Sequence, residues 1–426
     1  MGKLFGTDGV RGVVNKELTG ELAYKLGLAI GTFFGEGSAL LVGRDARLGG
    51  EMVYRAVTAG LLASGVKPYY AGLLPTPALQ YGVKALGFDG GVMITASHNP
   101  PEYCGIKVLT ASGIEISREQ ESEIEEIFYS QKWHYTPWWN IAEHVGRVEN
   151  VTETYIEAVL SHVDVEEIKR RRFRVLIDCG NGVGAYTSPE IARRLGCKVY
   201  SFNGHVDGHF PGRHPEPTVE SLKETAEVVK ALNVDLAVAH DGDADRAIII
   251  DDKGRVHWGD RSATLLCKYL VEKGETGTTV VTAVSSSVLV EEYLKPLGVE
   301  VLWTKVGSVI ISYKMLELGD KVLSGFEENG GFMYPPHQLV RDGGMKLALL
   351  LDMLAHEKKS LSELFDELPK YYPIKKKIPM SREEALKAVE RVKEYFKNYR
   401  LVTTVSYTHL RAHETSLHLV CRLLLE

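Results

Sequence analysis

The sequence predicts three similar mixed-sheet α/β domains around a central cleft, followed by a truncated or aberrant fourth, C-terminal domain. A chain of 426 residues is too long for one ordinary hydrophobic core. Short β-branched runs alternate with helix-period stretches, with glycine at the boundaries, in the same order three times. Each unit ends with a strand that opens into a polar loop. Because ligands gather beyond the carboxyl ends of such strands, we expect the three loops to share one cleft.

The first unit forms the predicted domain 1–148. Its expected elements are a strand at 39–43, a helix at 51–64, a strand at 66–72, a helix at 76–87 and a strand at 91–95. The last strand opens into the loop TASHNPPEY. An acidic helix then leads to Trp133, Trp138 and Trp139, which we expect to bury a seam between domains, since large aromatics dominate interface burial.

The second and third units form the predicted domains 149–252 and 253–368. Strands are expected at 173–178, 197–202 and 234–240 in the second unit, and at 279–284, 299–304 and 321–326 in the third. A helix-period stretch lies between each successive pair of strands. The last strand of the second unit opens into DGDADR, and the last strand of the third opens into EENGG.

The composition limits the partners and the location of the protein. The net charge of −6 provides no electrostatic case for binding nucleic acid or an anionic membrane. No stretch reaches about 18 consecutive apolar residues, and the start MGKLFG lacks a signal-peptide profile. The five cysteines include no C-x-x-C pair, which favours a reducing compartment. We therefore expect a cytoplasmic protein with no nucleic-acid and no membrane partner.

The loop DGDADR carries the pattern of a metal site. Asp241, Asp243 and Asp245 alternate, so on extended backbone their carboxylates point to one side. Three carboxylates this close repel one another unless a cation neutralises them, although a surface turn would also accept them. An EF-hand needs glycine at loop position six and glutamate at position twelve, where this chain has Arg246 and Asp252. Hard oxygen ligands therefore favour Mg²⁺.

The loop after the strand at 91–95 presents Ser97 at an abrupt turn, where a hydroxyl can act as a nucleophile or carry a phosphate. His98 is a poor activating base, because adjacent residues on extended backbone point apart, and we expect it to contact phosphate or the loop. Lys107 can neutralise a transferring phosphoryl group. A helix N-cap or a turn would explain Ser97 alone. Combined with a metal loop, phosphoryl transfer is the better interpretation.

Two further segments are ambiguous when taken alone. Glu327 and Asn329 are flanked by glycines and can hydrogen-bond vicinal sugar hydroxyls, but a hairpin turn explains them equally well. Arg11 lies in the amino-terminal turn GTDGVRG and by itself is a surface arginine.

Together these motifs resemble the α-D-phosphohexomutase family, and most closely its archaeal phosphoglucosamine mutase and phosphomannomutase-phosphoglucomutase branches. The matching segments, in family order, are FGTDGVRG at 5–12, TASHNPPEY at 95–103, DGDADR at 241–246, FEENGG at 326–331 and PPHQLVRDG at 335–343. The resemblance implies interconversion of glucosamine 6-phosphate and glucosamine 1-phosphate through a phosphoserine enzyme and a 1,6-bisphosphate intermediate.

The resemblance also implies roles for individual residues. Ser97 is the expected phosphoserine, and Mg²⁺ is expected on Ser97 and the three aspartates, with glucose or glucosamine 1,6-bisphosphate as activator. Arg11 and Lys107 match positions that assist proton and phosphoryl movement. The expected substrate-binding residues are His98, Arg246, Glu327 and Asn329. A hexose phosphate is the expected partner, and the oligomeric state, a homodimer included, is left open.

The chain departs from the family pattern at three places. Cys104 replaces an asparagine, and Asn329 and Gly331 stand where many members carry serine and histidine, so no histidine base is available there. Residues 369–404 begin like a fourth domain, but the family's phosphate loop R-x-S-G-T-E-P is missing. We interpret 405–426 as a non-native tail from a frameshift, chimeric join or vector read-through. Loss of that phosphate clamp would impair substrate affinity and activity.

Three alternatives to the glucosamine phosphate activity stay open. The first is phosphomannomutase/phosphoglucomutase activity within the same family. The second is a haloacid-dehalogenase-like phosphatase with Asp241 as nucleophile, although that motif normally opens its domain. The third is a non-catalytic sugar-phosphate binding protein, in which no phosphate reaches Ser97.

Overall fold

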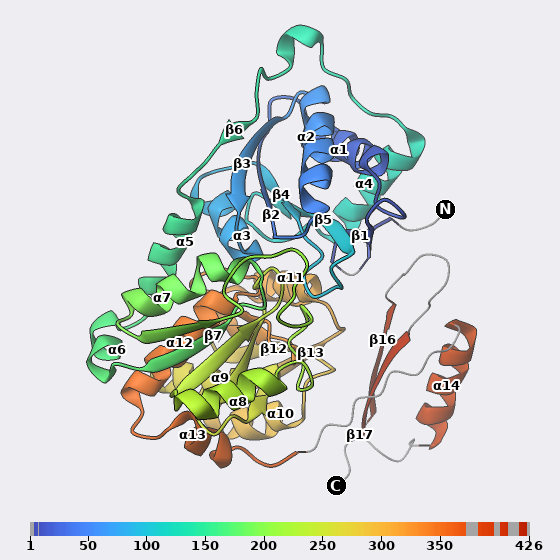
Figure 1. The fold of residues 1–426 in the computed structure, drawn as a ribbon. Coiled ribbons are helices and arrows are strands. Elements are labelled where there is room, and N and C mark those ends of the chain that lie inside the picture. The colour runs from blue at the N-terminus through green and yellow to red at the C-terminus, as the bar shows by residue number, and fades with distance from the viewer. Residues whose placement is uncertain (1–3, 7, 372–381, 396–400, 408–416, 424–426) are drawn as a thin grey trace.

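The computed structural model describes residues 4–6, 8–371, 382–395, 401–407 and 417–423, and it contains the three expected α/β units (Figure 1). In the first unit the strands are β1 (Val10–Val13), β2 (Ala39–Arg44), β3 (Lys67–Leu73), β4 (Gly90–Ile94), β5 (Tyr103–Thr110) and β6 (Gly146–Arg147). The helices are α1 (Gly20–Phe34), α2 (Gly50–Ala63), α3 (Thr76–Ala85) and α4 (Arg118–Ser130). The sheet order is β1-β5-β4-β2-β3-β6.

The second unit has a five-stranded sheet. Its strands are β7 (Arg174–Asp178), β8 (Lys198–Phe202), β9 (Leu236–His240), β10 (Ala247–Asp251) and β11 (Val256–His257), in the order β11-β10-β9-β7-β8. Its helices are α5 (Val151–Leu160), α6 (Val165–Arg171), α7 (Ser188–Arg194) and α8 (Lys223–Leu232). Every strand and helix expected in this unit is present within a few residues of its predicted place.

The third unit has a four-stranded sheet of β12 (Thr279–Ala283), β13 (Glu300–Thr304), β14 (Val322–Phe326) and β15 (Phe332–Met333), in the order β13-β12-β14-β15. Its helices are α9 (Gly259–Glu272), α10 (Leu289–Leu294), α11 (Ser308–Leu318), α12 (Gly343–His356) and α13 (Leu361–Glu367). The second and third units lie together, with the first unit above them in Figure 1.

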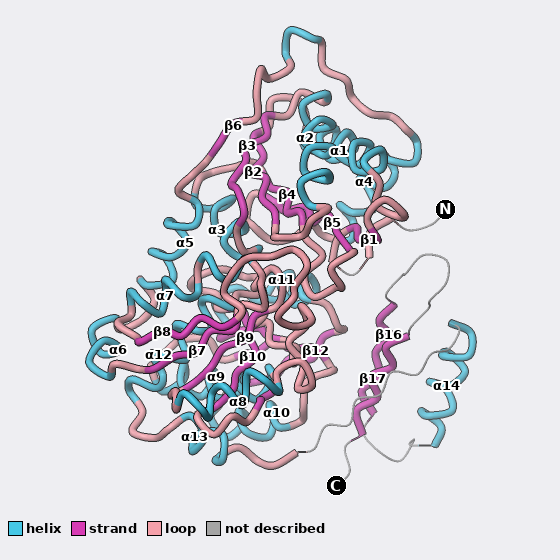
Figure 2. The backbone as a smooth tube through the Cα atoms, in the orientation of Figure 1, coloured by secondary structure: helices cyan, strands magenta, loops and turns pink. Residues whose placement is uncertain are grey.

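The three sheets share one plan, which explains why they are mixed. In each, a parallel group ends with a strand that turns back into an antiparallel partner. The strands that turn back are β4 into β5 and β9 into β10, which Figure 2 labels, and β14 into β15. The loops between these strand pairs are the three polar loops predicted from the sequence. Each therefore leaves the carboxyl end of a parallel strand, where ligands gather in such sheets.

Helix α12 joins the second and third units into one core. Every residue from Gly343 to Ala355 is buried, as expected for a helix that is covered on all sides. The helix contacts α5, α6 and α7 of the second unit as well as α9 of its own. This shared core fixes the position of the third unit's loop relative to the second unit's loop.

The expectation that the three tryptophans bury a seam between domains is wrong, because Trp133 packs within the first unit and the other two rings are exposed. Trp133 packs edge-on against Phe128, but Trp138 and Trp139 are 79% and 67% exposed. The reason is the path of the chain, which runs from α4 to β6 over the outer end of the first unit, away from the other units (Figure 1). No seam between units is available there for these two rings.

The C-terminal part contains α14 (Arg382–Tyr395) and an antiparallel pair of strands, β16 (Leu401–Tyr407) and β17 (Leu417–Leu423). The predicted start of a fourth domain at 369–404 and the predicted non-native tail at 405–426 fall in part outside the described residues, and both stay predictions. The domain boundaries likewise stay predictions.

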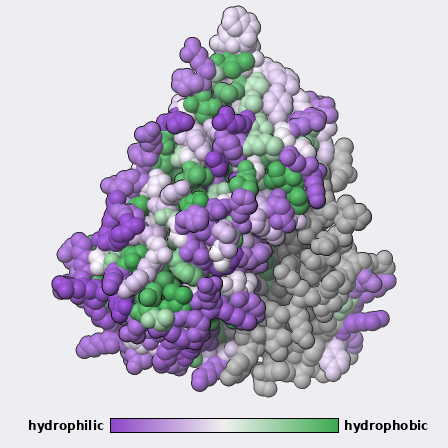
Figure 3. All heavy atoms as spheres, viewed as in Figure 1, coloured by the Kyte–Doolittle hydropathy of each residue, from purple (hydrophilic) through white to green (hydrophobic). Residues whose placement is uncertain are grey.

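Within the described residues, no helix is both long and apolar enough to cross a membrane. Hydrophilic side chains predominate on the face in Figure 3.

Candidate active site

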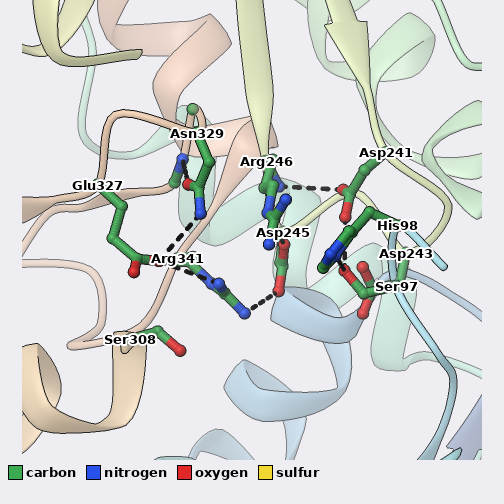
Figure 4. Close-up of polar contacts among 12 residues, drawn as sticks. Ser97, His98, Asp241, Asp243, Asp245, Arg246, Ser308, Glu327, Asn329 and Arg341 are labelled. Atoms are coloured by element: carbon green, nitrogen blue, oxygen red, sulfur yellow. Dashed lines mark hydrogen bonds and ion pairs between the residues drawn. The ribbon is translucent and has the colours of Figure 1, made fainter. Parts of the chain in front are cut away.

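The three polar loops meet at one place, with side chains that converge from all three units (Figure 4). The Ser97 hydroxyl donates a hydrogen bond to Asp241 Oδ2 at 2.7 Å, which joins the first loop to the second. An isolated β-bridge between Arg246 and Gly331 joins the second loop to the third. The sequence expectation that these loops face a shared site is confirmed for the fold. A small pocket between the units, with a volume of about 10 Å³, is lined by Asp245, Ser308 and Arg341, among others.

Ser97 is fully buried and has a left-handed backbone with φ of 50°. Its N–H donates to the Thr95 hydroxyl at 2.9 Å. His98 Nδ1 lies 3.5 Å from the Ser97 hydroxyl, closer than extended backbone would allow, because the chain turns here. Burial and the nearby Arg246 and Arg11 lower the pKa of His98 well below its usual value. His98 is therefore a neutral neighbour of the serine, placed as expected for a loop or phosphate contact.

The three aspartates have buried carboxylates, with one oxygen of each within 4.8 Å of the others. Their convergence comes from a turn with left-handed Ala244 at φ of 58°, and not from the extended strand predicted. Burial, followed by repulsion from Asp245 and Asp243, raises the pKa of Asp241 well above its usual value. A cation bound between the carboxylates would remove this repulsion.

Two carboxylate oxygens of the triad that accept no hydrogen bond show where such a cation fits. Asp243 Oδ2 accepts a hydrogen bond from the Thr76 hydroxyl at 2.6 Å, and Asp245 Oδ2 pairs with Arg341 at 2.6 Å. The other oxygen of each, Oδ1, is buried with no hydrogen-bond partner in the described structure. Buried carboxylate oxygens without donors are the ligands that Mg²⁺ prefers. The residues present therefore fit a hard divalent cation.

Two cationic side chains from the first unit face this cluster. Lys107 on β5 is fully buried, with its ammonium 3.5 Å from Asp245, 3.7 Å from Asp243 and 3.4 Å from Glu115. Burial alone would lower the pKa of Lys107, but the three carboxylates outweigh it and raise the pKa above its usual value. A buried ammonium beside the aspartates is placed to stabilise negative charge that develops on a nearby group.

Arg11 on β1 reaches the serine loop directly. Its guanidinium donates to Asn99 Oδ1 at 2.7 Å and to the Ala96 carbonyl at 3.3 Å, and it pairs with Asp8 at 3.4 Å. It is therefore part of the site and not the surface arginine that its turn alone suggests.

Glu327 in the third loop is buried, and burial raises its pKa while Arg341 opposes that shift. The amide of Asn329 donates to Glu327 Oε2 at 3.4 Å. Arg246 is also buried, 3.8 Å from Asp245. All ten sequence-predicted site residues thus lie in or beside one cluster.

Sequence reasoning missed Arg341, which connects two of the loops. Its guanidinium donates to Glu327 at 3.1 Å and to Asp245 at 2.6 Å. The segment PPHQLVRDG could have indicated this residue, because its arginine directly precedes Asp342, the N-cap residue of α12. Thr76, at the start of α3, was also missed, because nothing in its local sequence indicates that it meets Asp243.

The arrangement has the elements that phosphoryl transfer requires. It places a serine hydroxyl, three carboxylates that could hold a cation, and three arginines around one point, so charge on a transferring phosphoryl group would be stabilised without reorganisation. Four flanking cations accompany the aspartate triad: Arg11, Lys107, Arg246 and Arg341.

Comparisons with known proteins agree with this chemistry. Residues 2–134, 153–254 and 258–372 match the models of phosphoglucomutase/phosphomannomutase alpha/beta/alpha domains I, II and III. The chain is 59% identical to a phosphoglucosamine/phosphogalactosamine mutase of Sulfurisphaera tokodaii over 381 residues, which covers 89% of this chain and 83% of the relative. It is 44% identical to a phosphoglucomutase/phosphomannomutase of Thermococcus kodakarensis over 410 residues, covering 95% and 89%.

A solved structure has the same fold. It is a phosphoglucomutase/phosphomannomutase family protein from Burkholderia thailandensis, with a TM-score of 0.84 and 22% identity, over 99% of this chain and 93% of that one. With three matched domains, close relatives and the convergent loops, the resemblance inferred from the motifs is confirmed. The chain belongs to the phosphoglucomutase/phosphomannomutase family and is a phosphohexomutase-type enzyme.

Proposed function

We propose that the protein interconverts glucosamine 6-phosphate and glucosamine 1-phosphate, with Ser97 as the residue that carries the phosphoryl group. The observation that carries this proposal is the position of the Ser97 hydroxyl, 2.7 Å from Asp241 in the aspartate triad. A relative that is 59% identical acts as a phosphoglucosamine/phosphogalactosamine mutase, which supports glucosamine phosphate as substrate. Phosphomannomutase/phosphoglucomutase activity is the second candidate, supported by the relative that is 44% identical.

The proposed reaction has two balanced transfers. In the first, a sugar hydroxyl oxygen attacks the phosphorus on Ser97, the bond from phosphorus to Oγ breaks, and the hydroxyl proton ends on Oγ. In the second, the Ser97 hydroxyl attacks the other phosphoryl group of the sugar 1,6-bisphosphate, and the proton returns to the departing sugar oxygen. Lys107 is the ammonium nearest the triad, and Arg11 holds the serine loop. Both are placed to stabilise the transferring group.

The remaining roles follow from the same geometry. The three aspartates, with the phosphate on Ser97, would hold Mg²⁺, which supplies charge neutralisation for the transfer. Glu327 and Asn329 would bind the sugar hydroxyls, while His98 and Arg246 would contact phosphate. A hexose 1,6-bisphosphate would load Ser97 and act as activator.

We also propose a cytoplasmic location. In support, Cys104, Cys179, Cys197 and Cys267 are free and buried. The sequence leaves the oligomeric state open, a homodimer included, and light scattering of the purified chain measures it.

The test is phosphate loading of Ser97. The protein is incubated with Mg²⁺ and glucose 1,6-bisphosphate, and its intact mass is measured before peptide mapping. The proposal predicts one phosphate on Ser97, absent from Ser97→Ala and present in Ser112→Ala, which removes a hydroxyl from another turn of the same unit.

The same variants separate the alternatives. Ser97→Ala should abolish mutase turnover, whereas a haloacid-dehalogenase-like phosphatase with Asp241 as nucleophile would keep its activity. A binding protein without catalysis would bind hexose phosphate and leave Ser97 unmodified. Conversion of glucosamine, mannose and glucose phosphates, compared by kcat/KM, then decides the substrate.

A further inference from the structure

Arg47 is a buried side chain that points at the backbone of the Ser97 loop. It follows β2, is 1% exposed, and uses every N–H of its guanidinium. Two donate from Nη2, to the carbonyls of Ser97 at 2.6 Å and Asn99 at 2.7 Å. Two donate from Nη1, to the carbonyls of Pro100 at 2.6 Å and Tyr103 at 3.0 Å. The fifth, on Nε, pairs with Asp45 at 3.1 Å.

Asp45 provides a second link to the backbone of Ser97, through the Thr95 side chain. Its Oδ2 accepts from the Thr95 hydroxyl at 2.7 Å, and the Thr95 oxygen accepts from the N–H of Ser97 at 2.9 Å. Both backbone polar groups of Ser97 are therefore tied to one Asp45–Arg47 pair: its carbonyl directly and its N–H through Thr95. Because Asp45 and Arg47 are both fully buried, water does not compete for these bonds.

Arg47, Asp45 and Thr95 together form a clamp on the Ser97 backbone, and the second unit covers this clamp. The ring of Phe210 lies 5.2 Å from the Arg47 guanidinium. Gly242 packs so closely that a Cβ there would lie 2.6 Å from the Ser97 carbonyl oxygen. The loop is thus held by Arg47 on one side and by the backbone of the metal loop on the other.

The conformation of Ser97 explains why a clamp is needed. A left-handed backbone is unfavourable for a non-glycine residue, and it persists only where the surroundings over-determine it. Serine has no special preference for this region, so a free loop would relax and turn the hydroxyl away from Asp241. The four carbonyl bonds from Arg47 are the contacts that oppose this relaxation.

We propose that Arg47 is a positioning residue that holds the Ser97 turn in the one geometry that both accepts and returns a phosphoryl group. This inference rests on the proposed phosphoryl transfer through Ser97. Since all five donors are used within the protein, Arg47 acts on the rate of transfer and does not bind the substrate phosphate. A lysine cannot replace it, because an ammonium has three donors at one point and cannot reach four carbonyls.

The test compares Arg47→Lys with two further variants. Thr95→Val breaks the N–H arm of the clamp and keeps the buried charges. Arg44→Lys is the matched control, because Arg44 is the last residue of β2, pairs with Glu51 at 2.9 Å and has no side-chain hydrogen bond to the Ser97 loop among the described residues. Single-turnover loading of Ser97 from glucose 1,6-bisphosphate is followed by intact mass, along with kcat and KM for the sugar phosphate and the affinity for Mg²⁺ by calorimetry.

We expect Arg47→Lys to slow Ser97 loading and kcat by about 100-fold, and Thr95→Val by about tenfold, since misplacing a reacting atom by about 1 Å has effects of this size. KM should change less than about threefold, and Arg44→Lys should match the wild type. If Arg47→Lys folds and loads Ser97 at the wild-type rate, the positioning role of Arg47 is overturned, but the proposed function is not. If Arg47→Lys does not fold, a wild-type loading rate in Thr95→Val overturns the same role. A rise in KM with unchanged kcat also overturns it. Absence of phosphate on wild-type Ser97 overturns the proposed function itself, and this inference with it.

Discussion

The Ser97 hydroxyl lies 2.7 Å from Asp241 Oδ2, although 144 positions of sequence separate the two residues. This hydrogen bond joins the turn after β4 to the turn after β9. It places the Ser97 hydroxyl at the edge of the carboxylate triad. The chemistry proposed for this protein depends on that contact.

Replacing Asp241 tests the metal site. Asp241→Asn removes one of three mutually repelling buried carboxylates, so the metal-free protein should become more thermally stable than the wild type. Mg²⁺ should raise the Tm of the wild type, because a ligand that binds only the folded state stabilises it, and this increase should be lost in Asp241→Asn. Scanning calorimetry with and without Mg²⁺ measures both. An equal Mg²⁺-dependent increase in the variant would mean that the cation binds elsewhere.

Gly242 should be essential for placement of the serine loop. In Gly242→Ala the added Cβ would lie 2.6 Å from the Ser97 carbonyl oxygen, a contact that requires one loop to move. We expect Ser97 loading to slow by about 10- to 100-fold with small changes in Tm. Gly20→Ala is the control, since its Cβ meets no atom closer than 4.0 Å. Equal loading rates in the two variants would contradict the close approach of the loops.

Arg341 should be energetically coupled to Glu327. Arg341→Met leaves buried Glu327 and Asp245 without their shared partner, which should cost on the order of 3 kcal/mol of unfolding free energy. The double variant Arg341→Met/Glu327→Gln removes one of the stranded charges and should be more stable than Arg341→Met. Urea unfolding of the wild type, both single variants and the double variant measures this coupling. Simple additivity of the two single effects would show that the pair is not coupled.

Lys346 should make stability depend on pH above neutrality. It is buried in α12, where its ammonium donates to the carbonyls of Ala247 and Gly330, and burial lowers its pKa to about 7 from a usual value of 10.5. The unfolded chain therefore binds more protons between about pH 7 and 10.5, so stability should rise with pH across this window, by at most about 1.4 kcal/mol per unit.

Lys346→Met isolates that effect. The unfolding free energy of the wild type, relative to that of Lys346→Met, should rise steadily from about pH 7 to 10.5 and be constant below pH 7. A difference that does not vary with pH would place the pKa of Lys346 outside this range.

Much of this site could be predicted from the sequence, because each loop directly follows a strand. Apolar runs before Ser97, Asp241 and Glu327 identify strand ends, and parallel strands bring their carboxyl ends to one edge of a sheet. The plan repeats three times, so three loops could be expected together. The motifs around these residues then indicated the family.

Other features depend on contacts that local patterns do not encode. Arg47 reaches carbonyls some fifty positions away, and its local sequence GRDARLGG indicates only a turn before a helix. The aspartates converge through left-handed Ala244, a residue type that rarely adopts this backbone, so alternation predicted an extended strand instead. Trp138 and Trp139 are large aromatic residues of the kind that usually lies buried between domains. The path of the chain over the outer end of the first unit leaves them exposed.

The most direct test of the central claim is the return transfer from Ser97. Chain loaded with phosphate is separated from free bisphosphate and mixed with Mg²⁺ and glucosamine 6-phosphate, and its intact mass is followed in time together with the released products. If Ser97 carries the phosphoryl group, phosphate leaves it at least as fast as turnover and appears as glucosamine 1,6-bisphosphate. Phosphate that stays on Ser97, or that is released only as inorganic phosphate, would contradict it.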